Sequence, residues 1–93
     1  MVKTNLDLQK KARLLAVAGD ETRFKILGFM FQKKKACVSD IASAVGMTIG
    51  CISHHLQIMR DNGFFETKRE GNNICYTLVD SSFNKKLKKI ITN

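Results

Sequence analysis

Hydrophobic residues recur every three or four positions between Leu8 and Asp61, which is the spacing of amphipathic helices. The residues between these stretches suit helix ends. Gly19 stops the first stretch, Asp20 can cap the second, and Gly63 can adopt the left-handed conformation that ends the last. The pattern therefore predicts four helices, spanning Leu8–Ala18, Asp20 to the run Lys33-Lys34-Lys35, Ser39–Val45 and Thr48–Asp61, with apolar stripes such as Leu8, Ala12, Leu15 and Phe24, Leu27, Phe31.

After Gly63 the pattern changes to strict alternation. One alternating run begins at Phe64, a second ends at Leu78, and the turn-forming segment Glu70-Gly71-Asn72-Asn73 lies between them, which predicts a β-hairpin. A last helix, capped by Asp80 or Ser81, carries Phe83, Leu87, Ile90 and Ile91 on one stripe. The predicted order is α-α-α-α-β-β-α, a mainly α (α+β) winged helix-turn-helix occupying residues 1–93 as one domain.

The third and fourth predicted helices have the spacing of a helix-turn-helix unit, in which small Ala42 and the turn residue Gly46 permit a sharp angle. Within the fourth helix, the apolar residues Ile49, Ile52, Leu56 and Met59 fall on one side. The opposite side carries Gly50, Ser53, His54 and Gln57, whose polar side chains can hydrogen-bond to base edges or phosphates. Thr48 is the predicted cap, at a helix start that would attract a phosphate. The alternative is an ordinary solvated helix face.

The chain carries 16 Lys and Arg against 8 acidic residues, a net charge of +8, which favours a polyanionic partner. The predicted reading helix holds few of these charges. Phosphate neutralisation is therefore expected from the wing, through Lys68 and Arg69, and from Lys33–Lys35, with Lys10, Lys11 and Arg13 as further candidates. The alternative for Lys68 and Arg69 is a charged hairpin that discourages aggregation.

These segments resemble the ArsR/SmtB-type, arsenic-repressor-like winged-helix regulators. AGDETRFKIL (18–27) is similar to the family's LADPTRLRIL, residues 37–65 to its CVCDLAEALGLSQSTVSRHLKVLREAGLV, and KREGNNICYTL (68–78) to its wing RREGRxVYYRL. The resemblance covers about residues 15–78. It implies a homodimeric repressor joined through its first and last helices, acting on double-stranded DNA at an inverted-repeat operator. The family's DNA-contacting positions fall on Thr48, Ile49, Gly50, Ser53, His54 and Gln57, with wing contacts near Arg69 and Asn72.

The chain departs from the resemblance in its metal ligands. The arsenic-sensing motif CVCDLC is CVSDIA at residues 37–42, so only Cys37 remains of its three thiols. The last helix lacks the histidine and carboxylate ligands of zinc-sensing members and offers only Asp80. The identity of any inducer, whether a soft metal ion, a metalloid or another signal, therefore stays open.

The three cysteines, Cys37, Cys51 and Cys75, are widely spaced and contain no CxxC pair, so reduced thiols are expected. Two sensing alternatives use them. Cys51, His54 and His55 have a spacing that can chelate a metal, in a site completed by Cys37, Cys75 or a partner subunit. We favour instead a DNA-contacting His54, a structural His55 and a semi-buried Cys51. A thiol switch needs two close cysteines; Cys37, at a helix N-terminus, is the most reactive candidate.

Other classes of function find less support. There is no phosphate loop, nucleophile motif or carboxylate partner for the histidines, so an enzyme is not expected. No signal sequence or membrane span is apparent, and a cytoplasmic location is expected. The last helix, with KKLKK between apolar residues, could instead bind a membrane surface, but its stripe is better explained by pairing with the first helix of a partner subunit. A winged helix that binds a protein instead of DNA would carry acidic or bulky apolar residues on its outward helix face, and Gly50, Ser53, His54 and Gln57 are neither.

Overall fold

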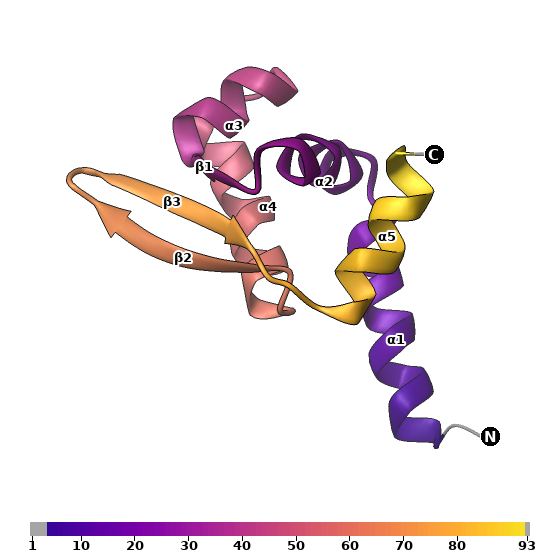
Figure 1. Cartoon of the computed structure of the whole chain (residues 1–93). Helices are drawn as coiled ribbons and strands as arrows, with labels where there is room; N and C mark the ends of the chain where they lie inside the picture. Colours follow the sequence, from indigo (N-terminus) through magenta and orange to yellow (C-terminus); the bar gives the residue numbers. More distant parts are fainter. Residues whose placement is uncertain (1–3, 93) are drawn as a thin grey trace.

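The computed structural model describes residues 4–92 as a winged helix-turn-helix. Figure 1 shows the β-hairpin and the first helix projecting in different directions from a centre formed by α2, α3 and α4. The elements, in chain order, are α1 (Asn5–Ala18), α2 (Glu21–Lys33), β1 (Lys35–Cys37), α3 (Val38–Val45), α4 (Ile49–Asp61), β2 (Phe65–Glu70), β3 (Asn73–Leu78) and α5 (Ser82–Thr92). All five predicted helices and the hairpin are present, so the predicted fold class is confirmed.

The strand β1 was not predicted from the sequence. The helix α2 ends at Lys33, Lys34 has a positive φ of 65°, and the chain continues at Lys35 as a three-residue strand. The sheet is antiparallel in the order β1-β3-β2, with Ala36 opposite Tyr76. A three-residue strand is too short to show an alternating pattern, so its partner in the tertiary structure determines it.

The core lies where α2, α3, α4 and the base of the hairpin meet. Its most buried side chains are at most 1% exposed: Ile26, Leu27, Met30, Ile41, Ile52, Leu56, Met59 and Phe64. Each large apolar side chain contributes about 1.5–3 kcal/mol when fully buried. The predicted stripe of α2 is only partly correct. Leu27 and Phe31 are buried, Phe24 is 38% exposed, and Ile26 and Met30 complete the buried face.

Side-chain oxygens cap four of the five helices. Thr4, Asp20, Thr48 and Ser81 each accept the backbone N–H of the residue three positions later. The predicted caps Asp20 and Thr48 are confirmed, and Ser81, rather than Asp80, caps α5. The hydrogen bond from the Arg23 N–H lowers the pKa of Asp20, because it stabilises the carboxylate. The helix α3 differs from the others, since its N-cap residue Cys37 makes no side-chain capping hydrogen bond.

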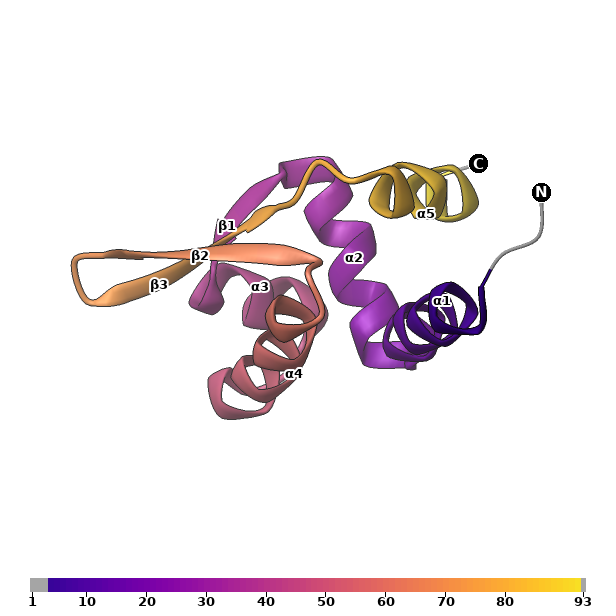
Figure 2. The same ribbon diagram turned by 90° about the horizontal axis from the view of Figure 1, so that it is seen from below.

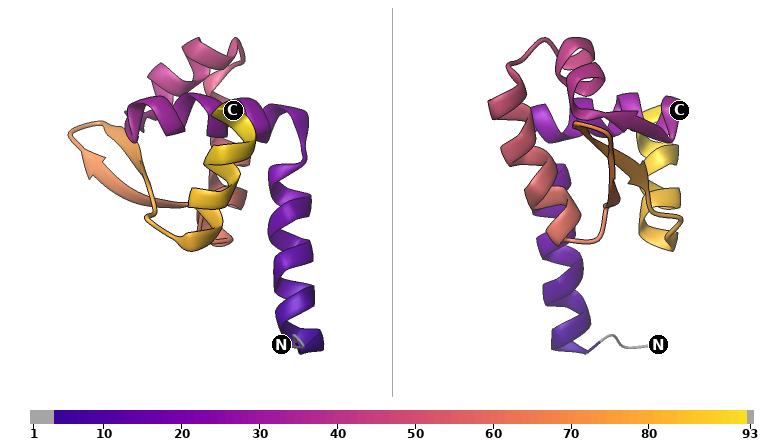
Figure 3. Two further views of the ribbon diagram at one scale, coloured as in Figure 1. Left: turned by 45° about the vertical axis from the view of Figure 1, so that its right-hand side comes forward. Right: turned by 90° about the vertical axis from the view of Figure 1, so that its left-hand side faces the viewer.

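The helices α1 and α5 leave apolar side chains uncovered. Leu6, Leu8, Leu15 and Ile90 are between 53% and 66% exposed. A groove of about 510 Å³ lies between the two helices, lined by Leu15 on α1 and Phe83, Leu87 and Ile90 on α5. Figure 3 shows both helices on the side of the molecule away from the tip of the wing. Of these residues, Leu8 and Leu15 belong to the stripe that the sequence predicted for the first helix.

Candidate nucleic-acid interface

The helix α4 divides into a buried side and an exposed side. Ile52, Leu56 and Met59 have no exposed surface, whereas Gly50 and Gln57 on the other side are exposed. His54 is also exposed and Ser53 is half-buried. Figure 2 shows α4 at the edge of the molecule, with the hairpin extending beyond it. The polar side of α4 is therefore accessible over consecutive turns of one helix.

The first turn of α4 is more exposed than the sequence indicated. Ile49 was placed with the apolar side, but 56% of its surface is exposed, so that placement is wrong. It is the first residue of the helix and precedes Ile52, where the buried side of α4 starts. Cys51, expected to be semi-buried, is exposed as well. An exposed isoleucine at this position can make apolar contact with a thymine methyl group.

Arg23 joins three helices next to this face, a role that the sequence analysis missed. Its Nε donates to the Val17 carbonyl at the end of α1 at 2.7 Å. Its Nη1 lies 3.3 Å from Nδ1 of His55 on α4. An arginine beside buried Ile26 and Leu27 was the available signal, because a cation in such a position needs partners. His55 is thus a hydrogen-bonded structural residue that fixes α4 against α2.

The wing carries the predicted basic residues on its exposed part. Lys68 and Arg69 lie on β2 and Asn72 lies in the turn, and all three are exposed. Nearby, Lys35 Nζ on β1 lies 2.6 Å from the Glu70 carboxylate, and the hydrogen bond from Lys35 lowers the pKa of Glu70. Because Lys35 is paired with Glu70, its charge is partly neutralised.

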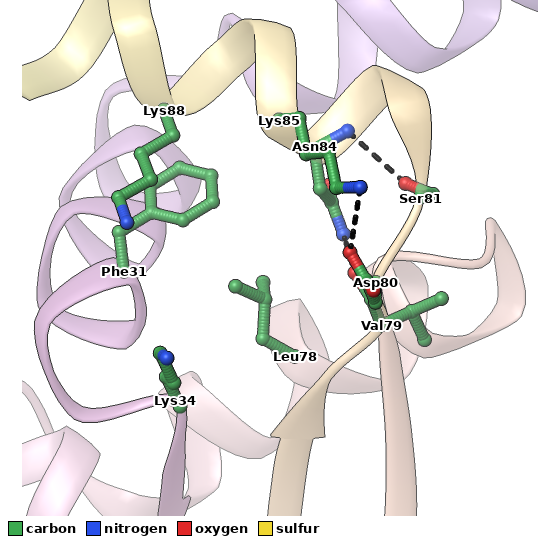
Figure 4. A pocket seen from close by; sticks show the side chains of 9 residues that line it. All are labelled: Phe31, Lys34, Leu78, Val79, Asp80, Ser81, Asn84, Lys85 and Lys88. Atoms are coloured by element: carbon green, nitrogen blue, oxygen red, sulfur yellow. Dashed lines mark hydrogen bonds and ion pairs between the residues drawn. The ribbon is translucent and has the colours of Figure 1, made fainter.

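Lys34, the middle lysine of the run 33–35, lines a cavity to which no residue of α4 contributes. This cavity of about 390 Å³ lies between the end of α2, the end of β3 and the start of α5, and Lys85 and Lys88 also line it (Figure 4). Lys85 pairs with Asp80 at 3.5 Å in this cavity. Of this run, Lys35 is paired with Glu70 and Lys34 lines a cavity that contains no residue of α4.

The structure joins Cys37 and Cys75 in a disulfide, so the expectation of reduced thiols is wrong for this pair. The two residues lie opposite each other in the β1·β3 ladder, with Cα atoms 3.8 Å apart. Their 38-residue separation gave no sign of this contact, because β1 itself was not predicted. Cys51 is the free cysteine of the described residues and lies on α4.

The structure does not assemble a metal site from the candidate ligands. Within residues 4–92, no group of three or more His, Cys, Asp or Glu side chains is placed to hold a metal ion. Cys51 and His54 are exposed on α4, whereas His55 contacts Arg23 and the other two cysteines are bonded to each other. The sequence-based preference for a structural His55 agrees with this arrangement.

Comparison with known proteins identifies the family. A family model described as "Bacterial regulatory protein, arsR family" matches residues 20–67, more than half of the chain. The chain belongs to this family. The match includes the helix-turn-helix and the start of the wing, so the ArsR/SmtB-type resemblance is confirmed. The family consists of regulators, in agreement with the expectation that the chain is not an enzyme.

Individual relatives are transcriptional regulators, and the solved structures among them share the fold of this chain. An HTH-type transcriptional regulator of Methanocaldococcus jannaschii is 32% identical over 72 residues, which are 77% of this chain and 81% of the relative. The solved structure of the AntR antimony-specific transcriptional repressor superposes with a TM-score of 0.88 at 29% identity, covering 99% of this chain and 83% of that one. A homodimeric winged helix-turn-helix DNA-binding domain from Mycobacterium bovis gives a TM-score of 0.83 at 24% identity, covering 97% and 85%.

Several relatives are longer than this chain. The transcriptional repressor SmtB homolog of Synechocystis is 27% identical over 78% of this chain, and the match covers 54% of that relative. A cadmium resistance regulatory protein homolog of Staphylococcus aureus is 29% identical over 74% of this chain, and the match covers 57% of it. Among the residues that the structure describes, no helix is long and apolar enough to cross a membrane.

Proposed function

We propose that this chain is a DNA-binding transcriptional repressor, with residues 1–93 acting as one winged helix-turn-helix domain. The observation that carries the proposal is the division of α4. Its apolar side is completely buried, while Gly50, His54 and Gln57 form an exposed polar side. The net charge of +8 supplies the attraction to a polyanion.

In this proposal, α4 reads bases and the wing positions the protein. Gln57 has the donor and acceptor geometry for adenine, and Ser53 and His54 can bond to bases or phosphates. Thr48 and the first amides of α4 accommodate a phosphate. Ile49 contacts a thymine methyl group. Lys68, Arg69 and Asn72 hold the sugar-phosphate backbone beside the major groove, a contact that does not depend on sequence.

Gly50 provides a specific test of close approach. A Cβ built at Gly50 meets no protein atom within 4 Å, so the fold does not require glycine there. A glycine in the middle of a helix costs about 0.5–1 kcal/mol of stability relative to alanine, and Gly50, in the first turn of α4, is expected to cost part of this. The presence of glycine at position 50, which lowers stability and is not required by packing, is explained if a DNA backbone passes next to it.

The expected result for Gly50→Ala is therefore a more stable protein that binds its operator less tightly. Stability is measured by urea unfolding, and affinity by fluorescence anisotropy with a duplex selected from a random-sequence pool. Gln57→Ala is expected to lower affinity for the selected duplex more than for random DNA, by about 1–3 kcal/mol. Lys68→Ala is expected to weaken binding to both duplexes equally. Equal losses on both duplexes for Gln57→Ala and Lys68→Ala, with unchanged binding by Gly50→Ala, would show that α4 is not the reader.

We also propose that two copies pair through α1 and α5 and bind an inverted-repeat operator. The support is the exposed apolar surface of Leu6, Leu8, Leu15 and Ile90 and the groove between the two helices. In the groove, Leu15 of α1 lies across from Phe83, Leu87 and Ile90 of α5, and exposed apolar surface of this kind marks protein interaction sites. A dimer would carry twice +8, or +16, so its binding to DNA should weaken steeply as salt is added.

A further inference from the structure

The Cys37–Cys75 disulfide connects the two parts of the proposed DNA interface. Cys37 is the last residue of β1 and the N-cap of α3, where the helix-turn-helix begins. Cys75 lies in β3, the central strand of the sheet and one strand of the wing. The loop that the bond closes contains α3, α4 and β2. One covalent bond therefore fixes the wing to the start of the reading unit.

The bond also lies next to a proposed DNA contact. Lys68 on β2 is directly opposite Cys75 on β3. Directly opposed residues of an antiparallel pair project from the same face of the sheet, with Cβ atoms about 4.5–5.5 Å apart. The same face carries Lys35 and Glu70, whose side chains form the ion pair between β1 and β2. A change at the cysteines therefore occurs next to Lys68, in the middle of the wing.

Without the disulfide, the link between β1 and the wing is short. The strand β1 pairs with β3 over three residues, at the edge of the sheet. The Leu78 N–H donates to the Lys34 carbonyl, so Lys34 and Leu78 form a hydrogen-bonded pair of the antiparallel ladder. Hydrogen-bonded and non-hydrogen-bonded pairs alternate along such a ladder, which makes Cys37 and Cys75 a non-hydrogen-bonded pair. Side chains approach each other most closely in pairs of this kind. The two sulfurs can thus bond or separate while the surrounding ladder remains paired.

We propose that Cys37 and Cys75 form a reversible thiol–disulfide switch, in which the disulfide form binds the operator more tightly. The inference deepens the proposed function, on which it rests. A protein that works on chromosomal DNA is surrounded by small thiols that keep most cysteines reduced, and disulfides in such compartments are usually transient and redox-sensing. The pair is a modification site whose state reports the balance between oxidants and thiols.

The chemistry follows from the accessibility of the two cysteines. Cys37 is half-buried, whereas Cys75 is 1% exposed, so an oxidant meets Cys37 first. Cys37 is the N-cap of α3 and its side chain makes no capping hydrogen bond, so in the reduced protein the first amides of α3 are available to stabilise its thiolate. A hydroperoxide transfers one oxygen to this thiolate, giving a sulfenic acid, and the alkoxide or hydroxide that leaves takes up a proton to become an alcohol or water. The Cys75 thiol then displaces the hydroxyl, forming the S–S bond and water.

The return step is thiol–disulfide exchange. A small dithiol attacks the accessible sulfur of Cys37, Cys75 leaves as a thiol after taking up a proton, and the second thiol of the reductant releases Cys37. The reductant becomes a disulfide. Two electrons are exchanged in each direction, so the cycle is balanced.

The disulfide changes affinity by pre-organising the wing. In the reduced protein the three-residue β1·β3 ladder remains but the covalent link does not, so the wing moves more relative to α3 and α4. DNA binding must then restrict this motion, and that ordering lowers the affinity. Couplings between two sites are commonly 5- to 150-fold, and a short existing ladder places this one near the lower end. We expect about tenfold tighter operator binding by the oxidised form.

The experiment measures binding by the whole chain after treatment with hydrogen peroxide or with dithiothreitol. The probe is a duplex selected from a random-sequence pool by the protein in each redox state, and a random duplex is the reference. Alkylation followed by mass spectrometry should find one reactive cysteine in the oxidised form and three in the reduced form. Circular dichroism confirms that both forms are folded.

Matched variants separate the possible causes. Cys37→Ser and Cys75→Ala should bind like the reduced form under both treatments. Serine is a good N-cap, so Cys37→Ser should retain α3. Cys51→Ser, which removes the free thiol on α4, should switch like the unmodified protein.

Equal operator affinity in both redox states overturns the switch, as does tighter binding by the reduced form. Loss of the redox response in Cys51→Ser would assign the response to Cys51 and would also overturn the proposal. These outcomes leave the proposed function standing. It fails separately if neither redox form prefers the selected duplex over random DNA.

Discussion

Asn84 is the buried polar residue that attaches α5 to the rest of the fold, and its replacement makes a quantitative test. The residue is 3% exposed. Its side-chain Nδ2 donates to the Phe64 carbonyl at 3.2 Å and to the Val79 carbonyl at 2.8 Å, so that one amide holds α5 to both ends of the hairpin. Asn84→Ala removes both hydrogen bonds without removing any other partner of α5.

The magnitude depends on what happens to the two carbonyls. Each keeps a second partner, because Phe64 O also accepts the Val79 N–H and Val79 O accepts the Ser81 N–H, both at 3.0 Å. Neither acceptor is orphaned, so the loss is two net hydrogen bonds of about 0.5–1.5 kcal/mol each. Alanine regains up to about 0.7 kcal/mol through its higher helix propensity. The expected destabilisation is therefore between about 0.3 and 3 kcal/mol, with a central value of about 1.5 kcal/mol.

Urea unfolding followed by far-UV circular dichroism measures this change. Asn84→Asp has nearly the same shape and should be more destabilising than Asn84→Ala near neutral pH, because it places a carboxylate against two carbonyl oxygens. Acidification should restore part of the loss, since a protonated carboxyl can donate one hydrogen bond. Asn73→Ala, at an exposed site, serves as control and should change stability by less than about 0.5 kcal/mol. An Asp variant as stable as wild type would refute the role assigned to the amide.

Two further predictions address the dimer and the core. Leu15→Glu, on the groove between α1 and α5, should convert the proposed dimer to a folded monomer in analytical ultracentrifugation. The control Lys25→Glu, at an exposed position, should leave the dimer intact. A dimer that persists in Leu15→Glu would place the interface elsewhere. Tyr76 is the single tyrosine of a chain without tryptophan, and burial raises its pKa above the ordinary value of 10.0. Its absorbance titration should have a higher midpoint in the folded protein than in urea, and stability should fall as pH rises through the folded pKa, because the unfolded tyrosine ionises first. Coincident midpoints would contradict burial of the hydroxyl.

The sequence by itself determined the elements whose signals are local. Helical spacing, the caps Asp20 and Thr48, and the turn residue Gly63 lie within a few positions of the structure they specify. The alternating runs around Gly71 specified the hairpin in the same way. The polar side of α4 could be read because residues on one helix keep fixed angular relations whatever the rest of the fold does.

The tertiary structure decided the features that join distant segments. The strand β1 exists because β3 pairs with it, and only that pairing brings Cys37 to Cys75 across 38 positions. Arg23 and Asn84 have the same origin, since their partners lie on other elements. Ile49 was wrongly expected to be buried, because a helical wheel gives the direction in which a side chain points but not whether another segment covers that side chain. Periodicity is a property of the local backbone, whereas burial, pairing and bonding depend on which segments meet. The sequence therefore defined the elements of a DNA-binding fold, and the packing of those elements revealed the bond that we propose regulates it.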